Sequence, residues 1–249
     1  ELLALDLPLR YRLSSLDPDD VSLELLDVWQ ESASICRHFH ICLQALDDQL
    51  LKRMNRSYSV ARGVDLLQEI HRRLPMAGIG TDLITGFPGE DRDCFQRGLE
   101  LFSVLPLTYA HIFPYSERAG TAATRLDGEV EAGERKRRSS RLRAEVERKR
   151  REYGLNMTGQ SVDIVIEGVL EGRVEHRGDS LHSGRWLTGT TGEYLSAAIR
   201  FDNLGEFAHP GELENKSSTL PDFGSIVRAR IYDYDKDTGR SLCDALNPV

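Results

Sequence analysis

A regular alternation of strand-like and helix-like runs fills the first half of this chain, and it restricts the fold more than any other feature. Strand-like runs are expected at 9–15, 38–44, 77–88 and 109–116, with amphipathic helix-like runs after them. Such alternation is typical of βα units that build a parallel sheet. Because an eight-stranded barrel needs twice as many units, we expect residues 1–130 to be the second half of a TIM-like α/β barrel.

A strongly basic segment follows at 131–154. Residues 131–152 contain ten Lys or Arg and five Glu, which gives a charge of +5. Leu142 and Val146 offer only a thin apolar stripe, so we expect a long, exposed connecting helix. Two interpretations stay open: a solvated face held by pairs of opposite charge, or a helix that contacts phosphate groups.

The pattern then changes to short runs of period 2 separated by glycines. Runs of this kind occur at 160–168, 172–178, 191–201 and 224–235, and the stretch 209–224 interrupts them as an expected loop. About five short strands in this length predict a small all-β barrel of the OB-like kind over 155–249.

Composition sets further limits. The chain has 249 residues and a net charge of −8, which disfavours a uniformly basic nucleic-acid binder. Its four cysteines (Cys36, Cys42, Cys94 and Cys243) form no C-x-x-C pair, which suits the reducing cytoplasm. No run is long and apolar enough for a membrane helix, so we expect no membrane partner. Since the chain opens at Glu1, we expect it to be part of a longer protein.

Polar residues in the first half gather where the strands should end. In a parallel barrel, the carboxyl ends of the strands face the ligand. The turn "GFPGE" (86–90) follows the third strand, and Glu90 is expected to cap the next helix. Asp82 lies inside that strand and needs either a structural partner or a substrate. His38 and His40 share one side of their strand, either as packed interior histidines or as a metal pair.

Four stretches with these residues occur in a distinctive order. They are "RLSSLDPDD" (12–20), "HFHICLQ" followed by "LLKRMNRSY" (38–58), "TDLITGFPGE" (81–90) and "HIFPYSERAGT" (111–121). In order and spacing they resemble the radical S-adenosylmethionine (SAM) methylthiotransferases that modify tRNA. The "HIFPYS" and "SSLDPDD" forms point to the threonylcarbamoyladenosine branch. The β-rich end resembles TRAM, the tRNA-binding OB-like domain of that family, and the first half then corresponds to half of a radical SAM barrel.

The resemblance implies an activity, cofactors and sites. The full enzyme would add a methylthio group at C2 of N6-threonylcarbamoyladenosine near the anticodon of tRNA, using SAM and [4Fe–4S] clusters. Arg56 could pair with the SAM carboxylate, or be a surface residue at a helix end. Phe113 and Tyr115 could stack on adenine, or pack in the core. The residues expected to bind SAM are Ser14, Ser15, Gln44, Arg56, Gly86 and Tyr115; no residue of this chain is assigned to a metal.

Two departures from the family pattern matter. The C-x-x-x-C-x-x-C triplet that holds the cluster is absent, and Cys36 and Cys42 have the wrong spacing to replace it. We therefore expect the chain to be inactive alone and to depend on a preceding part of the same protein. The family's Leu-Gln-Ser-Gly-Ser-Asp turn is replaced by residues 43–48, "LQALDD", which changes a turn beside the expected SAM position.

The last 95 residues would contact tRNA through basic and aromatic side chains. Nine Lys or Arg stand against fifteen Asp or Glu over 155–249, a charge of −6, so the contact would need a local basic face. The candidates are Arg173, Arg177, Arg185, Trp186, Arg228 and Arg230. Two other functions stay open: a non-catalytic RNA-binding fragment, and another radical SAM enzyme such as a coproporphyrinogen-oxidase-like protein.

Overall fold

The computed structural model of the chain describes residues 3, 9–176, 180–200, 223–235 and 237–246, and for 171–176 and 180–185 the backbone alone. The chain divides into two compact units, Glu1–Lys149 and Arg150–Val249. The expected loop at 209–224 lies outside the described residues as far as 222. None of the helices in these described ranges has the length and apolar character that a membrane span requires.

The first unit is built on a parallel sheet. Its strands are β1 (His38–His40), β2 (Gly78–Thr85) and β3 (Tyr109–Pro114), in the order β1-β2-β3. The register pairs His40 with Gly80, and Asp82 with His111. The expected βα alternation is therefore confirmed for the second, third and fourth predicted strands.

The first predicted strand is wrong. Residues 9–15 form no strand: Tyr11 makes an isolated parallel bridge to Ile35, and Leu16, just after the run, makes another to Ile41. Ser15 has φ 59°, a left-handed conformation that interrupts an extended run. The run at 38–44 is also shorter than expected, because β1 ends at His40 and Gln44 has φ 60°.

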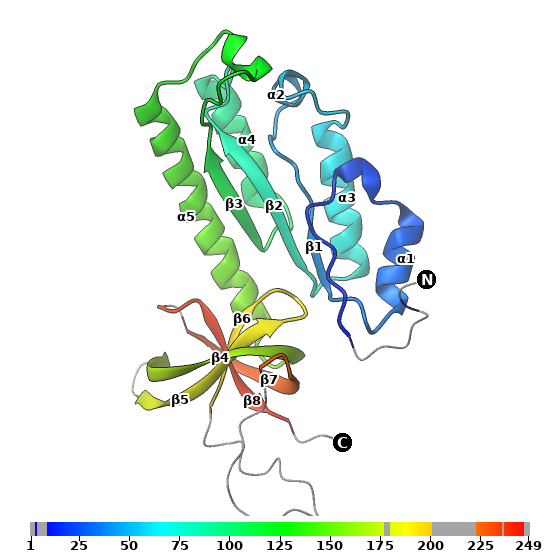
Figure 1. Ribbon diagram of the computed structural model, residues 1–249, viewed down its shortest axis with the longest axis vertical. Helices are drawn as coiled ribbons and strands as arrows, with labels where there is room; N and C mark the ends of the chain where they lie inside the picture. Colours follow the sequence, from blue (N-terminus) through cyan, green and yellow to red (C-terminus); the bar gives the residue numbers. More distant parts are fainter. Residues whose placement is uncertain (1–2, 4–8, 177–179, 201–222, 236, 247–249) are drawn as a thin grey trace, which may run out of the picture. The chain divides into compact units, whose positions relative to one another are not determined.

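Helices and short 3-10 turns precede, connect and follow these strands (Figure 1). Their bounds are η2 (Pro18–Asp20), α1 (Leu23–Glu31), α2 (Asp48–Arg53), α3 (Val60–Arg73), α4 (Arg92–Val104), η3 (Ala122–Arg125) and α5 (Ala132–Asn156). A short polar side chain caps most of the helix starts: Ser22 precedes α1, Asp47 α2, Ser59 α3 and Asp91 α4. Asp17 caps the short turn η2.

The apolar core lies between the sheet and these helices. Phe39, Ile79 and Ile112 of the three strands are buried in one cluster with side chains of four helices. The helical members of that cluster are Leu26 and Trp29 of α1, Leu66, Leu67 and Ile70 of α3, Phe95 and Phe102 of α4, and Leu142 and Val146 of α5. Helices α3 and α4 cover one side of the sheet, and no helix of the drawn chain lies across the other (Figure 1).

The second unit contains a small closed barrel. Its strands are β4 (Ser161–His176), β5 (Ser180–Thr191), β6 (Ser196–Arg200), β7 (Ile226–Asp235) and β8 (Arg240–Ala245), in the order β4-β5-β6-β8-β7. Small and branched side chains fill it, among them Ile164, Ala198 and Ile231. The predicted five-stranded barrel is confirmed, with the runs at 160–168 and 172–178 joined into the single long strand β4.

Candidate functional site

The carboxyl ends of the parallel strands β1, β2 and β3 lie at one edge of the sheet. We call this edge, with the residues that follow the strands there, the rim. After β1 the chain stays beside β2: the Gln44 N–H donates to the Asp82 carbonyl and the Ile84 N–H donates to the Gln44 carbonyl, both at 2.9 Å. Leu16 lies on the other side, where its N–H donates to the His40 carbonyl at 2.9 Å. The chain segments that hold Ser15 and Gln44 therefore both meet the end of β1.

Two rim residues have unusual backbones. Ser15 and Gln44 are in the left-handed region, at φ 59° and 60°. Non-glycine residues avoid this region, and those that adopt it often lie at ligand sites, at a cost of roughly 1–3 kcal/mol each. Ser14 and Ser15 are exposed and Gln44 is half-buried. The sequence marks these residues by type, but it does not reveal their backbone conformation.

Arg56 and Tyr115 occupy different surroundings. The Arg56 guanidinium is exposed and lies 3.8 Å from Asp17, a separation that permits only a weak attraction in water. The Tyr115 ring packs edge-on against Phe87, with centroids 5.2 Å apart. Its hydroxyl is buried and has no hydrogen-bond partner among the described residues. A buried hydroxyl of this kind is a group that a ligand could satisfy.

Gly86 is part of the packing beneath the rim. A Cβ at this residue would lie 2.3 Å from Cγ of Arg135, so the space above the glycine is filled by that side chain. Its φ of 71° also requires glycine. The Gly86 N–H donates to the Glu90 carboxylate at 2.7 Å. Glycine here lets α5 approach the turn closely.

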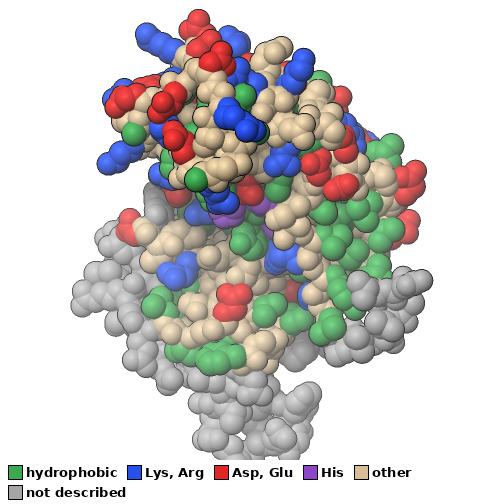
Figure 2. Space-filling view, turned by 45° about the horizontal axis from the view of Figure 1, so that its top comes forward, with side chains coloured by type: hydrophobic (Ala, Val, Ile, Leu, Met, Phe, Trp, Pro, Cys, Tyr) green, Lys and Arg blue, Asp and Glu red, His purple; other side chains and the backbone are tan. Residues whose placement is uncertain are grey.

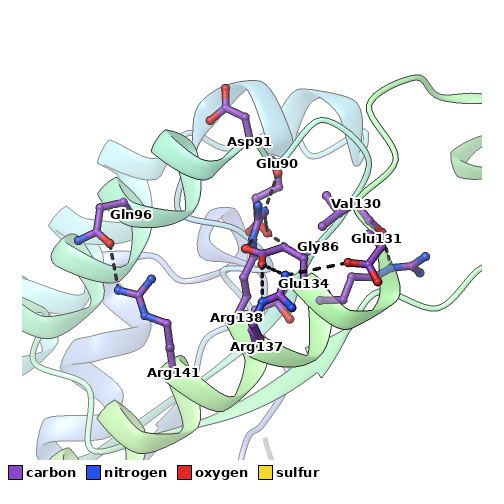
Figure 3. Close-up of polar contacts among 12 residues, drawn as sticks. Gly86, Glu90, Asp91, Gln96, Val130, Glu131, Glu134, Arg137, Arg138 and Arg141 are labelled. Atoms are coloured by element: carbon purple, nitrogen blue, oxygen red, sulfur yellow. Dashed lines mark hydrogen bonds and ion pairs between the residues drawn. The ribbon is translucent and has the colours of Figure 1, made fainter.

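Glu90 has a different partner from the one expected. Asp91, not Glu90, caps α4, by accepting from the Cys94 N–H at 2.7 Å. The Glu90 side chain turns inward and pairs with Arg138 of α5, with Nη1 to Oε2 at 2.8 Å and side-chain exposures of 6% and 7% (Figure 3). Arg138 also donates to the Glu90 carbonyl at 2.6 Å and to Glu134 at 2.9 Å. The prediction that Glu90 caps the helix is wrong, because the carboxylate joins the turn to α5.

Most basic residues of α5 donate hydrogen bonds to other elements of the first unit. Arg143 donates to the Ile112 carbonyl of the edge strand β3 at 2.8 Å. Arg135 donates to the Tyr115 carbonyl at 3.0 Å, and Lys149 to the Leu105 carbonyl at 2.7 Å. Leu142 and Val146 are buried in the core. The prediction of an exposed helix is therefore wrong for the face of α5 that packs on the sheet region. The basic side chains there donate to carbonyl groups that would otherwise need water.

A polar cluster lies on one side of the sheet. His38 Nε2 and the Tyr109 hydroxyl share a hydrogen bond of 2.7 Å, and burial lowers the pKa of His38 to about 3. His40 Nε2 lies 3.2 Å from Asp82 Oδ1, and burial lowers the pKa of His40 although Asp82 opposes this. The Cys42 thiol lies 3.7 Å from Asp82 Oδ2; burial, and then Asp82, raise its pKa to about 11. Both histidines are therefore neutral at ordinary pH.

The candidate tRNA residues of the second unit separate into three groups. Trp186 is fully buried, so the expectation of an exposed stacking surface there is wrong. Arg228 is exposed and pairs with Asp163 at 3.0 Å, and Arg230 is exposed on the same strand. Arg177 lies outside the described residues, and the side chains of Arg173 and Arg185 also lie outside them. Only Arg228 and Arg230 are thus placed as surface cations.

Neither the small cavity of the first unit nor the charge on the face shown in Figure 2 marks a further binding site. A small cavity of about 30 Å³ lies between Ile84, Cys94 and Leu142, which belong to β2, α4 and α5. It includes none of the expected SAM residues. Acidic and basic side chains are interspersed on the face of the molecule shown in Figure 2, where no uniformly basic area stands out.

The residues present fit the two expected cofactors unequally. The unpartnered Tyr115 hydroxyl and the half-buried Gln44 side chain suit a polar ligand such as SAM. Cys36, Cys42, Cys94 and Cys243 form no disulfide with one another. They also lie too far apart in sequence to supply the closely spaced triplet of a radical SAM cluster. The ligands of a [4Fe–4S] cluster are therefore not found in this chain.

Comparison with known proteins agrees with the sequence motifs. "Threonylcarbamoyladenosine tRNA methylthiotransferase MtaB" of Rickettsia prowazekii is 37% identical over 158 residues, 64% of this chain and 37% of that protein. A "tRNA-2-methylthio-N(6)-dimethylallyladenosine synthase" of Symbiobacterium thermophilum is 34% identical over 214 residues, 85% of this chain and 46% of that protein. The chain thus spans less than half the length of either relative.

Solved structures show a weaker likeness. Coproporphyrinogen III oxidase (HemN) from Escherichia coli, a radical SAM enzyme, aligns over 61% of this chain and 34% of its own, with a TM-score of 0.45 and 17% identity. A likeness of that size does not by itself establish a common fold. No protein-family model matches the chain. The identities with the curated relatives confirm the resemblance: over the segment that it shares with them, the chain belongs to the tRNA methylthiotransferase family.

Proposed function

We propose that this chain is a section of a radical SAM enzyme that adds a methylthio group to an adenosine of tRNA. The observation that carries the proposal is the 34% identity with a curated relative over 85% of the chain, which includes both units. The carboxyl-end rim of β1 to β3 supports it, because ligands of parallel α/β folds bind at that end. A cytoplasmic location follows from the proposal, since tRNA is the substrate.

The rim residues would hold SAM, which supplies the methyl group and the radical chemistry of the family. Gln44 and Tyr115 would donate or accept hydrogen bonds there, while Ser14 and Ser15 would face its polar groups. Arg56 would pair with its carboxylate, provided that it leaves the weak contact with Asp17 at 3.8 Å. Gly86 would act indirectly by holding the turn against α5. Because the cluster ligands lie elsewhere, we infer that the chain is inactive alone.

The barrel unit would act as a TRAM-like domain that binds tRNA. Arg228 and Arg230 lie two residues apart on β7 and are both exposed, so they could contact neighbouring phosphates. The neighbouring Asp163 weakens the case for Arg228, because the pair must open for a phosphate to bind. Arg173, Arg177 and Arg185 remain proposed contacts on the strength of the family resemblance alone.

The substrate adenosine is proposed to carry an N6-threonylcarbamoyl group, because the "HIFPYS" and "SSLDPDD" stretches resemble that branch. The second candidate substrate is N6-dimethylallyladenosine, which is favoured by the name of the Symbiobacterium relative. The non-catalytic RNA-binding function is the remaining rival, and it is compatible with the missing cluster cysteines.

Deletion of the gene, followed by mass spectrometry of tRNA nucleosides, tests the proposal. We expect the methylthio form of threonylcarbamoyladenosine to disappear while its unmethylthiolated precursor accumulates. Loss of methylthio-dimethylallyladenosine instead would select the second substrate. An unchanged set of nucleosides would refute the enzyme and leave the RNA-binding function, which salt-dependent tRNA binding by the 249-residue chain would then test.

A further inference from the structure

Three side chains with different donor atoms meet on one side of the parallel sheet. His40 ends β1, Cys42 follows two residues later, and Asp82 lies in the neighbouring strand β2. Nε2 of His40 is 3.2 Å from Oδ1 of Asp82, and Sγ of Cys42 is 3.7 Å from Oδ2 of Asp82. One ligand atom from each residue lies within 4.8 Å of the other two.

One ring nitrogen of His40 lacks a hydrogen-bond partner among the described residues, while the other, Nδ1, lies 3.9 Å from the Cys42 sulfur. The residue is only 6% exposed, and its Nε2 makes no hydrogen bond within the described part of the chain, although Asp82 is close. A buried polar atom without a partner costs roughly 1–3 kcal/mol. Such a nitrogen, directed at a carboxylate and near a thiol, is accounted for if a cation lies between them.

The donor set matches the chemistry of zinc. Zn²⁺ is bound by His nitrogen, Cys sulfur and carboxylate oxygen, with bonds of about 2.0–2.3 Å in a tetrahedron. Donor atoms around such an ion therefore lie roughly 3.2–3.8 Å apart, and the two separations involving Asp82 already fall in this range. Sγ of Cys42 lies 3.9 Å from Nδ1 of His40, so the half-buried Cys42 side chain must rotate toward Nε2 to complete the set.

We propose that His40 Nε2, Cys42 Sγ and the Asp82 carboxylate bind a divalent zinc-class cation. On binding, the Cys42 thiol loses its proton to solvent and the sulfur bonds to the ion as a thiolate. A water molecule or His111 takes the fourth position. His111 pairs with Asp82 in the strand register, is exposed, and has its ring 5.6 Å from that of His40.

None of the three ligands is among the proposed SAM residues, although the Gln44 N–H donates to the Asp82 carbonyl at 2.9 Å. The site also makes no use of a [4Fe–4S] cluster. Cys36 and Cys94 are not part of the cluster of three, so replacing one of them provides a matched control. Cys94 is the better choice because it lies on α4, whereas Cys36 is two residues before β1.

The test is a titration of the untagged, metal-free 249-residue chain with Zn²⁺ by calorimetry, and with Co²⁺ by absorption spectroscopy. We expect one ion per chain and a Co²⁺–thiolate charge-transfer band. Cys42→Ser should abolish the band and weaken zinc binding at least about 100-fold, because loss of a direct ligand exceeds the 10–100-fold effect of an outer partner. Asp82→Asn should weaken it at least tenfold, and Cys94→Ser should change neither measurement.

Two results would overturn the proposal. One is failure of the unaltered chain to bind zinc; the other is an unchanged Co²⁺ band and zinc affinity in Cys42→Ser, which would mean an adventitious ion elsewhere. Circular dichroism of each variant checks that it is folded. Should Cys42→Ser not fold, Asp82→Asn takes its place, and an unchanged zinc affinity in that variant overturns the proposal.

Discussion

The ion pair between Glu90 and Arg138 is nearly removed from water, and replacing Arg138 by Met removes only one of its two charges. The Glu90 carboxylate would keep the Gly86 N–H at 2.7 Å and lose Arg138 at 2.8 Å. Breaking a buried pair in this way costs about 3–5 kcal/mol, because the remaining charge stays buried without its partner. We expect Arg138→Met to lower the free energy of unfolding of the first unit by that amount.

Two further variants separate the charge effect from packing. Glu90→Gln retains an acceptor for the Gly86 N–H, and together with Arg138→Met it removes both charges. The double variant should lie within about 1–2 kcal/mol of the unaltered chain. Arg137→Met is the matched control: its side chain is 67% exposed and pairs with Glu134, so it should cost less than about 1 kcal/mol.

The loss in Arg138→Met should also depend on pH. Burial already raises the pKa of Glu90, and removal of Arg138 takes away the main opposing influence. When the pKa of a carboxyl is higher in the folded than in the unfolded state, the free energy of unfolding falls as the pH rises through the folded-state pKa, because folding disfavours the charged form. We therefore expect a larger deficit at pH 8 than at pH 5.

The assay is urea unfolding followed by hydrogen-exchange mass spectrometry, with peptides from the first unit alone, so that the barrel unit does not contribute. A loss below about 1 kcal/mol for Arg138→Met would refute the reasoning. So would a double variant that is less stable than Arg138→Met, because the penalty would then come from lost packing and not from an unpaired charge.

Three further predictions concern single residues. Gly86→Ala should lower the free energy of unfolding by about 2–5 kcal/mol, because the backbone is left-handed and the new Cβ would meet Arg135. Gly120→Ala, with φ 82° and open space around it, should cost only about 1–2 kcal/mol in the same urea assay. Equal losses in the two variants would contradict the packing role of Gly86. Tyr115→Phe should leave the free energy of unfolding within about 0.5 kcal/mol or raise it, since the hydroxyl has no partner in the described structure; a loss above about 1 kcal/mol would show a hidden partner. Arg230→Gln should lower the slope of log tRNA affinity against log salt concentration by about one. Asp163→Asn should strengthen tRNA binding, because it releases Arg228. No change in either variant would show that β7 does not contact tRNA.

The parts of the fold that could be predicted from sequence are those set by the period of the apolar residues. Alternating apolar runs gave β2 and β3, and period-2 runs gave the barrel, because burial of one face imposes those periods. The run at 9–15 has the same pattern but makes only the isolated bridge of Tyr11 with Ile35, and Ser15 at its end adopts a left-handed backbone that no pattern reveals. Local propensity does not indicate which residues leave the regular conformation.

The site was less accessible because it depends on contacts between distant residues. Glu90 has the residue type and position of a helix cap, and only the approach of Arg138, 48 residues later, turns it inward. Trp186 has the composition of a stacking residue but fills the barrel core. The period of His38 and His40 did place these two side chains on one side of the strand, but the position of Cys42 beside them was not predicted. Their proximity to Asp82 required the register of the sheet.

Restoration of the modification in a deficient strain tests the proposed methylthiotransferase activity. The complete gene is introduced into a bacterium that lacks its own threonylcarbamoyladenosine methylthiotransferase, and tRNA nucleosides are measured by mass spectrometry. Our account predicts that the methylthio group reappears on threonylcarbamoyladenosine with the complete gene and does not reappear with the 249-residue chain alone. Absence of every methylthio nucleoside with the well-expressed complete gene would contradict the account.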